Sequence, residues 1–182
     1  MLDRNGIRQY ANKRYNDCNN KGNDTMIKEI HVFDFDGTLV DSSHRYRLNP
    51  ETGRIDLQYW IDNEHRALED SIIPEMVAHF RELNRNPEVF CMIATARIWC
   101  ELSEQFAAQH DLQCHVVARR GRDDSRGGVK LKVTGINRLL NLKQFRNVEE
   151  IHVYEDNLDY LNGICNTYDI AIPHFIASNQ GY

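Results

Sequence analysis

The stretch His31-Val-Phe-Asp-Phe-Asp-Gly-Thr-Leu-Val-Asp41 decides the fold of this 182-residue chain. Its apolar residues up to Phe35 predict a buried strand, because β-branched and aromatic residues favour strands. Asp34 and Asp36 alternate at the end of this strand, so both side chains lie on the same side of the extended chain. Two neighbouring carboxylates repel each other. The pair therefore indicates either a divalent-metal site that leaves one acid free for chemistry, or a simple turn out of the strand.

Downstream of this stretch, short apolar runs alternate with helical segments. The runs of strand length, including the first, are Glu29–Phe35, Glu88–Thr95, Leu112–Ala118, Glu150–Glu155 and Tyr168–Ile172. Apolar residues recur with helical spacing within 76–83, 102–108 and 136–142. This alternation predicts an α/β fold, a Rossmann-like doubly wound parallel sheet with helices on both faces. The carboxyl ends of the strands in such a sheet form the ligand crevice, which is where Asp34 and Asp36 fall.

The composition is that of an ordinary soluble globular protein, with 41 % hydrophobic and 27 % charged residues. A formal net charge of −5 disfavours a surface that binds polyanions everywhere, although it permits a local basic patch. No apolar run approaches the ~20 residues that span a bilayer, and no signal peptide is visible, so we expect no membrane partner and a cytoplasmic location. The five cysteines are irregularly spaced, which predicts reduced thiols. No pattern specifies an oligomeric state.

Residues 1–25 differ in composition from the rest of the chain. Between Asn12 and Asp24 the sequence is rich in Asn and charged residues and nearly lacks apolar ones. Such a segment cannot bury enough surface to offset the entropy lost on ordering, so we expect a flexible N-terminal arm. Its basic residues suit either a polyanion contact or plain solvation, and we expect a solvated tail. Residues 26–182 are expected to form one domain.

Asp34-Phe-Asp-Gly-Thr-Leu-Val-Asp-Ser42 resembles the first motif of the haloacid dehalogenase (HAD) superfamily of phosphatases. The later motifs of that family have counterparts in the same order, namely Thr95 ending the second strand, Lys130 or Lys132 starting a later helix, and Glu155-Asp156 after another strand. Taken singly, each of these later residues has an ordinary structural explanation, and their joint order favours the family motifs. The resemblance implies that residues 26–182 form a HAD-like phosphatase domain.

The resemblance also implies a role for each motif residue. Asp34 attacks phosphorus and becomes an aspartyl phosphate, which water then hydrolyses. Asp36 protonates the leaving oxygen and then activates the water. Thr95 and the motif lysine hold the phosphate and offset its charge. The residues expected to bind Mg²⁺ are Asp34, Asp36 through its carbonyl, Glu155 and Asp156. The further residues expected to bind substrate are Gly37, Thr38, Arg97, Arg122, Arg126 and Lys130.

Few residues are available for a cap over this site. HAD enzymes usually gain selectivity from insertions after the first motif or between the second and third motifs. Residues 41–73 suffice only for a small cap-like insertion, and a helix, a strand and a loop occupy most of residues 97–132. We therefore expect an open site, which suits a macromolecular end better than an enclosed small metabolite.

Four arginines gather before the motif lysine: Arg119, Arg120, Arg122 and Arg126. They predict either a clamp on a phosphate backbone or a solvated loop that Asp123 and Asp124 partly neutralise. The segment Asp124-Ser-Arg126, six residues before Lys132, resembles the D-x-R segment of phage polynucleotide kinase-phosphatases and of HAD domains in RNA-repair proteins. This spacing favours Lys132 as the motif lysine. Asn157 departs from those relatives, which usually carry Arg at that position.

These features predict a Mg²⁺-dependent phosphatase that hydrolyses phosphomonoesters through an aspartyl phosphate, on DNA or RNA 3′ ends or on nucleotides. Two alternatives stay open. One is a phosphatase of sugars or other metabolites with the same chemistry, and the other is a non-catalytic module that binds phosphate. The intact pair of Asp34 and Asp36 argues against the non-catalytic module, since the loss of either acid would remove turnover.

Overall fold

The computed structural model describes residues 27–112, 114 and 117–178, and the flexible arm expected over residues 1–25 lies outside them. Within these residues, five parallel strands form one sheet: β1 (Glu29–Phe33), β4 (Val89–Ile98), β5 (Val117–Arg120), β6 (Glu150–Glu155) and β7 (Ala171–Phe175). Their spatial order is β5-β4-β1-β6-β7. The first strand, β1, is central. Strands β4 and β5 follow on one side of it, and β6 and β7 follow on the other side. This order confirms the predicted doubly wound parallel sheet.

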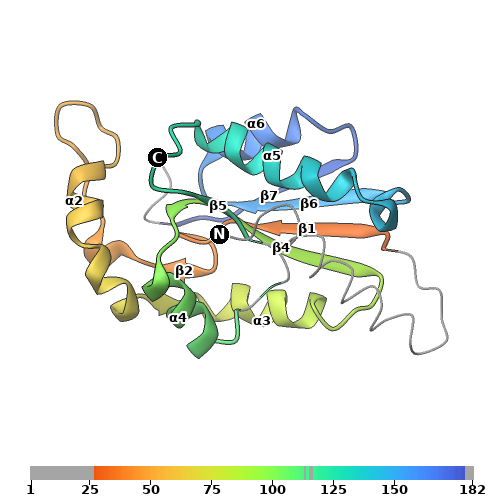
Figure 1. Cartoon of the computed structure of the whole chain (residues 1–182), viewed down its shortest axis with the longest axis horizontal. Coiled ribbons are helices and arrows are strands. Elements are labelled where there is room, and N and C mark those ends of the chain that lie inside the picture. The colour runs from red at the N-terminus through yellow and green to blue at the C-terminus, as the bar shows by residue number, and fades with distance from the viewer. Residues whose placement is uncertain (1–26, 113, 115–116, 179–182) are drawn as a thin grey trace.

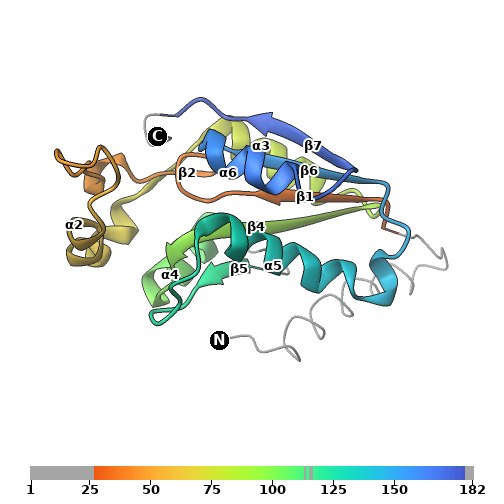
Figure 2. The same cartoon turned by 90° about the horizontal axis from the view of Figure 1, so that it is seen from above.

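Helices cover both faces of the sheet, as Figures 1 and 2 show. One face carries α3 (Pro74–Leu83) and α4 (Glu101–Gln109), and the other carries α5 (Gly128–Leu140) and α6 (Leu158–Cys165). Alternate residues of β1 point to the two helix layers. Val32 packs in the same core as Ile136 of α5, and the Phe33 ring contacts the Phe80 ring of α3 edge-on. Both faces are buried, which explains the nearly continuous apolar runs. Every helix in the described part of the chain is too short or too polar to cross a membrane.

Several strand boundaries differ from those that the sequence predicts. Strand β1 ends at Phe33 rather than Phe35, and β7 lies three residues later than the predicted Tyr168–Ile172. Strand β4 continues past Thr95 to Ile98, with an irregular step in its pairing with β5. Strand β5 begins at Val117, later than predicted, and takes in Arg119 and Arg120, where the sequence indicates a loop. The physical reason is that β5 is an edge strand, where long charged side chains are tolerated because one side of the strand faces solvent.

The segment between β1 and α3 projects from one end of the sheet, at the left of Figure 1. It contains the antiparallel strands β2 (Val40–Asp41) and β3 (Ser71–Ile72), and between them η1 (Ser43–Arg45), α2 (Leu57–Asp62) and η2 (Glu64–Glu69). The Arg45 guanidinium lies 4.1 Å from the ring centroid of the buried Trp60, which joins η1 to α2. This is the segment for which the sequence predicts a small cap-like insertion over residues 41–73.

Candidate active site

Lys132 joins the ends of the two central strands. The N–H of Asp34 donates to the Tyr154 carbonyl at 2.9 Å, so the pairing of β1 with β6 continues as far as this acid. The buried Lys132 Nζ donates to Asp34 Oδ1 at 2.7 Å and to Glu155 Oε2 at 2.5 Å. Lys130 lies about 200° away around α5 and is exposed. Lys132 is therefore the lysine at this site, and Lys130, which was expected to bind substrate, points away from it.

Three carboxylates, those of Asp34, Glu155 and Asp156, meet beside Lys132, and we call them the acidic group. One oxygen of each lies within 4.8 Å of the others. Ser178 Oγ donates to Asp156 Oδ2 at 2.5 Å. Burial, together with the nearby charge of Asp34, raises the pKa of Glu155 to about 8 and that of Asp156 to about 7. Burial also raises the pKa of Asp34, although Lys132 opposes the shift.

The acidic group fits a divalent cation. The Lys132 ammonium can neutralise one of the three carboxylates, and burial together with the charge of Asp34 leaves the pKa values of Glu155 and Asp156 raised. Mg²⁺ prefers oxygen ligands and is usually held by one or two carboxylates and several waters. Lys132 donates to one oxygen of Asp34 and one oxygen of Glu155, so each of the three carboxylates keeps an oxygen that could bind the ion.

Gly37 sets the path of the loop past the acidic group. Its φ of +75° lies in the left-handed region that favours glycine. A Cβ at this position would lie 2.0 Å from Asp156 Oδ2, so a larger residue would displace that carboxylate. Gly37 thus lets the chain turn sharply beside Asp156. The next residue, Thr38, is fully buried, and its hydroxyl has no hydrogen-bond partner within the described residues.

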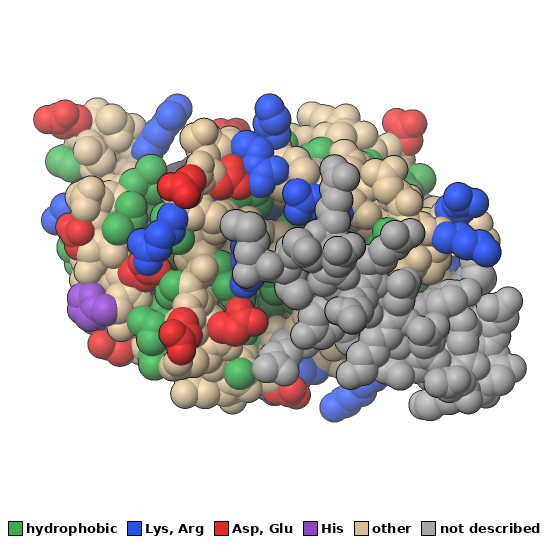
Figure 3. All heavy atoms as spheres, in the orientation of Figure 1, with side chains coloured by type: hydrophobic (Ala, Val, Ile, Leu, Met, Phe, Trp, Pro, Cys, Tyr) green, Lys and Arg blue, Asp and Glu red, His purple; other side chains and the backbone are tan. Residues whose placement is uncertain are grey.

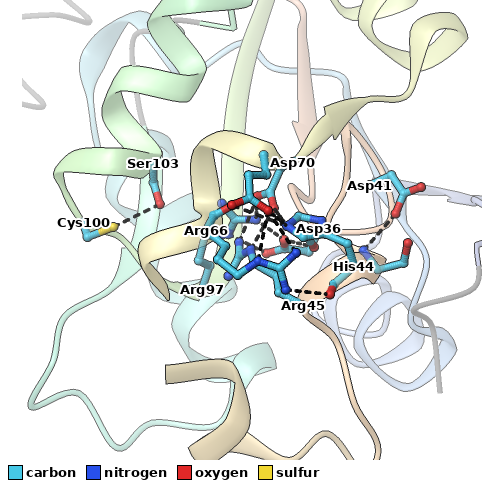
Figure 4. Close-up of polar contacts among 12 residues, drawn as sticks. Asp36, Asp41, His44, Arg45, Arg66, Asp70, Arg97, Cys100 and Ser103 are labelled. Carbon is cyan, nitrogen blue, oxygen red and sulfur yellow. Dashed lines mark hydrogen bonds and ion pairs between the residues drawn. The ribbon is translucent and has the colours of Figure 1, made fainter. Parts of the chain in front are cut away.

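The Asp36 carboxylate lies outside the acidic group, in a network of arginines shown in Figure 4. Arg97 Nε donates to Asp36 Oδ2 at 2.9 Å, and Arg97 Nη2 donates both to Asp36 Oδ1 and, at 2.8 Å, to Asp70 Oδ2. Asp70 Oδ1 also accepts from Arg45 Nε at 2.7 Å. Ser42 Oγ donates to Asp36 Oδ1 at 2.7 Å. Burial would raise the pKa of Asp36, but the Arg97 guanidinium outweighs burial and holds this pKa below its ordinary value.

This network modifies two expectations about the site. Arg97 is expected to bind substrate, and in the structure its Nε and Nη2 bind Asp36 and Asp70, while its Nη1 has no hydrogen-bond partner among the described residues. The side chain of Asp36 is not among the clustered metal-ligand oxygens of the described residues, so the expected contribution of Asp36 to a metal rests on its carbonyl. Asp70 and Arg45 were not identified from the sequence, because each is a single charged residue in the insertion with no motif around it.

Thr95 lies at the irregular step of β4, the strand beside β1. The residue is buried, and its Oγ1 accepts the N–H of Arg97 at 3.0 Å. A threonine hydroxyl that accepts one hydrogen bond can still donate its own hydrogen. Contrary to the prediction from the sequence, Thr95 does not end its strand, because β4 continues to Ile98. It lies at the step near the carboxyl end of β4, where such a donor can meet a phosphate oxygen.

The four arginines before Lys132 are paired within the chain. Their partners are Glu104 for Arg119, the carbonyls of Ala96, Asp124 and Arg126 for Arg120, Glu64 for Arg122, and the Asp124 carboxylate for Arg126. On the described part of the face in Figure 3, basic and acidic side chains are interspersed rather than gathered into one basic patch. The pairing favours the self-neutralised loop over the phosphate clamp expected of Arg122 and Arg126.

Two solved structures share this fold at low sequence identity. One belongs to the Pnkp1/Rnl/Hen1 RNA repair complex, with 14 % identity and a TM-score of 0.56 over 82 % of the present chain. The match covers 43 % of that chain, so the present chain spans less than half of its length. The other is the HAD domain of effector protein Lem4 from Legionella pneumophila, with 14 % identity, a TM-score of 0.55 and coverage of 86 % and 90 %. No curated protein matches the chain. These likenesses confirm the predicted HAD fold.

The amino-acid sequence also matches a family model, described as bacteriophage T5 5′-deoxynucleotidase, over residues 19–124. This interval is more than half of the 182 residues and includes Asp34, Asp36 and Thr95, while Lys132 lies beyond it. The fold and the matched motifs agree. The chain belongs to the bacteriophage T5 5′-deoxynucleotidase family, which here has the fold of a HAD phosphatase.

Proposed function

We propose that this protein is a Mg²⁺-dependent phosphatase that removes the phosphate from nucleoside 5′-monophosphates, with Asp34 as the nucleophile. The observation that carries the proposal is the acidic group with Lys132 at the carboxyl ends of β1 and β6. At this point the strand order reverses, and ligands of open α/β sheets bind at such points. The family match supports the choice of a nucleotide as substrate.

Lys132 prepares Asp34 for attack on phosphorus. Burial alone would lower the pKa of Lys132, but the charges of Asp34 and Glu155 outweigh burial and raise this pKa above its ordinary value. The ammonium therefore stays charged beside Asp34 Oδ1. The Asp34 carboxylate then forms a bond to phosphorus as the bond to the 5′ oxygen breaks, which leaves an acyl phosphate that water hydrolyses. Mg²⁺ held by Asp34 and Asp156 would neutralise charge on the phosphate. The Thr95 hydroxyl donates to a phosphate oxygen.

Asp36 transfers the protons that this reaction needs. Arg97 keeps the Asp36 carboxylate ionised, and in this form it accepts a proton from the attacking water in the second step. Protonation of the leaving oxygen in the first step needs Asp36 to carry a proton. A shift of Arg97 toward Asp70, which it already contacts at 2.8 Å, would permit this, because burial alone raises the pKa of Asp36.

The arginine pairing favours a mononucleotide over a polynucleotide end. A backbone clamp needs cations that are free to meet several phosphates, whereas Arg119, Arg122 and Arg126 each face a carboxylate of the same chain. The likeness to the RNA repair complex concerns the fold alone and does not identify a substrate. An oligonucleotide 3′-phosphate is therefore included as the competing substrate in the experiment below.

The proposal is tested by phosphate release with Mg²⁺ from deoxynucleoside 5′-monophosphates, 3′-monophosphates, 3′-phosphorylated oligonucleotides and sugar phosphates. We expect the highest kcat/KM for the 5′-monophosphates and no release from any substrate after Asp34→Asn or in EDTA. A preference for oligonucleotide 3′ ends or sugar phosphates would overturn the substrate assignment. Release that survives Asp34→Asn would overturn the mechanism.

A further inference from the structure

The tripeptide Glu-Ile-His occurs on the neighbouring strands β1 and β6, at the ends far from the acidic group. Glu29-Ile-His31 begins β1 and Glu150-Ile-His152 begins β6. The two strands are parallel, with Glu29 opposite Glu150 and His31 opposite His152. Residues two apart on a strand point to the same face, so the two glutamates and two histidines gather on one face of the sheet. We call these four side chains the histidine–glutamate cluster.

The side chains of this cluster converge. The rings of His31 and His152 are stacked, with centroids 4.3 Å apart and planes 7° apart. His31 Nε2 lies 3.0 Å from Glu29 Oε2, and His152 Nε2 lies 2.9 Å from Glu150 Oε2. One ligand atom from each of Glu29, His31 and His152 lies within 4.8 Å of the other two. The geometry therefore brings two imidazole nitrogens and the Glu29 carboxylate together, with the Glu150 carboxylate beside His152.

The opposite nitrogens of both rings are anchored. His31 Nδ1 lies 3.1 Å from Tyr154 Oη, and His152 Nδ1 lies 2.9 Å from His174 Nε2. Since an ionised carboxylate only accepts hydrogen bonds, each Nε2 carries its proton toward a glutamate, and each Nδ1 accepts. In histidines that bind metals, the second nitrogen donates its hydrogen to a fixed partner, and Tyr154 Oη and His174 Nε2 stand at that position for the two rings. The rings are thus held with Nε2 directed at the carboxylates.

The cluster is closed on the histidine side and open on the glutamate side. The His31 side chain is 4 % exposed, whereas that of Glu29 is 40 % exposed. An ion can therefore reach the cluster past flexible carboxylates and meet nitrogens that are shielded from water. Burial also lowers the pKa of His31 to about 4, so its imidazole is neutral at physiological pH, as a metal ligand must be.

We propose that Glu29, His31 and His152 bind a divalent transition-metal ion such as Zn²⁺, with Glu150 as the fourth ligand. Two imidazoles and two carboxylates suit the tetrahedral preference of Zn²⁺, and imidazole ligands select such ions over Mg²⁺. On binding, each imidazole takes its other neutral tautomer, in which Nδ1 carries the proton and faces Tyr154 Oη or His174 Nε2. Nε2 is then free to bind the ion, and the ligand atoms move inward to bond lengths of about 2.0–2.2 Å. The half-exposed glutamates can make this movement.

This site is separate from the proposed catalytic metal. Glu29 and Asp34 lie at opposite ends of β1, roughly 16 Å apart at about 3.3 Å per residue. The acidic group offers only oxygen ligands, whereas the histidine–glutamate cluster offers nitrogen as well. An ion at the cluster would connect β1 to β6 and stabilise the folded protein, since it binds the folded state alone.

The nitrogen ligands give the test its readout. In the full chain, Cu²⁺ bound at the cluster shows the nitrogen superhyperfine splitting of imidazole in its electron paramagnetic resonance spectrum. Calorimetry measures the affinity for Zn²⁺. We expect one ion bound through imidazole in the wild type and in Asp34→Asn, and a loss of at least roughly 10- to 100-fold in Zn²⁺ affinity in His152→Gln. His65→Gln removes an exposed histidine elsewhere and should bind Zn²⁺ as the wild type does.

Three results would overturn the proposal: Zn²⁺ affinity unchanged in His152→Gln, no nitrogen splitting in the wild type, or splitting that disappears in Asp34→Asn. Circular dichroism checks that His152→Gln is folded. Should it be unfolded, Glu29→Gln, at a half-exposed position, takes its place with the same expected loss of Zn²⁺ affinity. None of these results depends on phosphatase activity.

Discussion

The two ends of the β1–β6 pair carry clusters of ionisable side chains with opposite character. At the carboxyl end, the acidic group offers only oxygen atoms, and burial raises the pKa values of Asp156 and Glu155 to about 7 and 8. At the amino end, the histidine–glutamate cluster offers both nitrogen and oxygen, and burial lowers the pKa of His31 to about 4. The same two strands thus supply two sites of different chemistry.

The difference shows how one physical effect acts on acids and bases. Removal from water disfavours the charged form of any group, so buried carboxylates hold protons and buried imidazoles release them. The acidic group consequently needs a cation before all its members ionise, whereas the imidazole of His31 is neutral without one. A hard ion such as Mg²⁺ suits the first end, and a borderline ion such as Zn²⁺ suits the second.

The largest expected effect is that of Asp34→Asn at the carboxyl end. An amide cannot form the acyl phosphate, so kcat should fall by on the order of 10⁴-fold or more. Steady-state release of phosphate from a deoxynucleoside 5′-monophosphate measures this. Asp62→Asn, at an exposed position on α2, is the matched control and should leave kcat unchanged. Substantial turnover by Asp34→Asn would show that this end of the sheet does not act through a covalent intermediate.

Asp36→Asn should have a smaller effect of a different kind. The nucleophile and the acidic group remain, but proton transfer to the leaving oxygen is lost, which typically costs about 10²–10⁴-fold in rate. We expect kcat to fall while KM changes little. A substrate with a good leaving group, such as p-nitrophenyl phosphate, should lose less activity in the first step, because its oxygen needs no proton. An effect on KM alone would make Asp36 a binding residue.

The sequence predicted the motif residues of the site better than the ion pairs that hold them. The motif spacing located Asp34, Lys132 and Asp156, because chemistry at the ends of parallel strands fixes both residue type and order along the chain. The ion pair of Arg97 with Asp70 could not be predicted. It joins a strand to an insertion, and no local pattern specifies which distant charges will meet.

The sequence likewise predicted the buried strands better than the edge strand. Buried strands such as β6, Glu150–Glu155, were located correctly because their apolar runs are long and uninterrupted. The edge strand β5 was misplaced, since Arg119 and Arg120 have the polarity of a loop and become strand only by pairing with β4. The repeated Glu-Ile-His tripeptide was visible in the sequence, but its meaning depends on the register of β1 with β6.

In the absence of metal, the stability of the carboxyl end should fall as pH rises. The folded protein holds protons on Glu155 and Asp156 up to about pH 8 and 7, whereas the unfolded chain releases them near pH 4. Their contribution is thus complete below the unfolded values and is lost as pH rises through the folded ones. Urea unfolding in EDTA between pH 6.5 and 8.5 should show a loss on the order of 3 kcal/mol. Saturating Mg²⁺ should reduce this loss, and an equal slope with and without Mg²⁺ would contradict the metal assignment.

Gly37→Ala tests whether the position of Asp156 matters for the acidic group. It forces a Cβ to within 2.0 Å of Asp156 Oδ2 at a φ of +75°. Gly53→Ala is the matched control, since Gly53 has a φ of +66° and a Cβ there would meet none of the described residues within 4 Å. Both variants should lose about 1–2 kcal/mol from backbone strain. Gly37→Ala should lose roughly 1–3 kcal/mol more and need a higher Mg²⁺ concentration for half-maximal activity. Equal effects of the two variants would mean that Asp156 can move freely.

The smallest expected effect belongs to His31, and its sign is opposite to that of the acidic group. The folded pKa of about 4 lies below the ordinary value of 6.5, so the unfolded chain takes up a proton first as pH falls. The contribution of His31 is complete above pH 6.5 and is lost as pH falls toward 4. Between pH 7 and 5 it amounts to at most about 2 kcal/mol. Urea unfolding in EDTA at both values should show a smaller loss for His31→Gln than for His65→Gln, whose exposed imidazole is the reference. Equal losses would mean that water reaches the His31 ring, and the contrast between the two ends of the strands would then rest on the carboxylates alone.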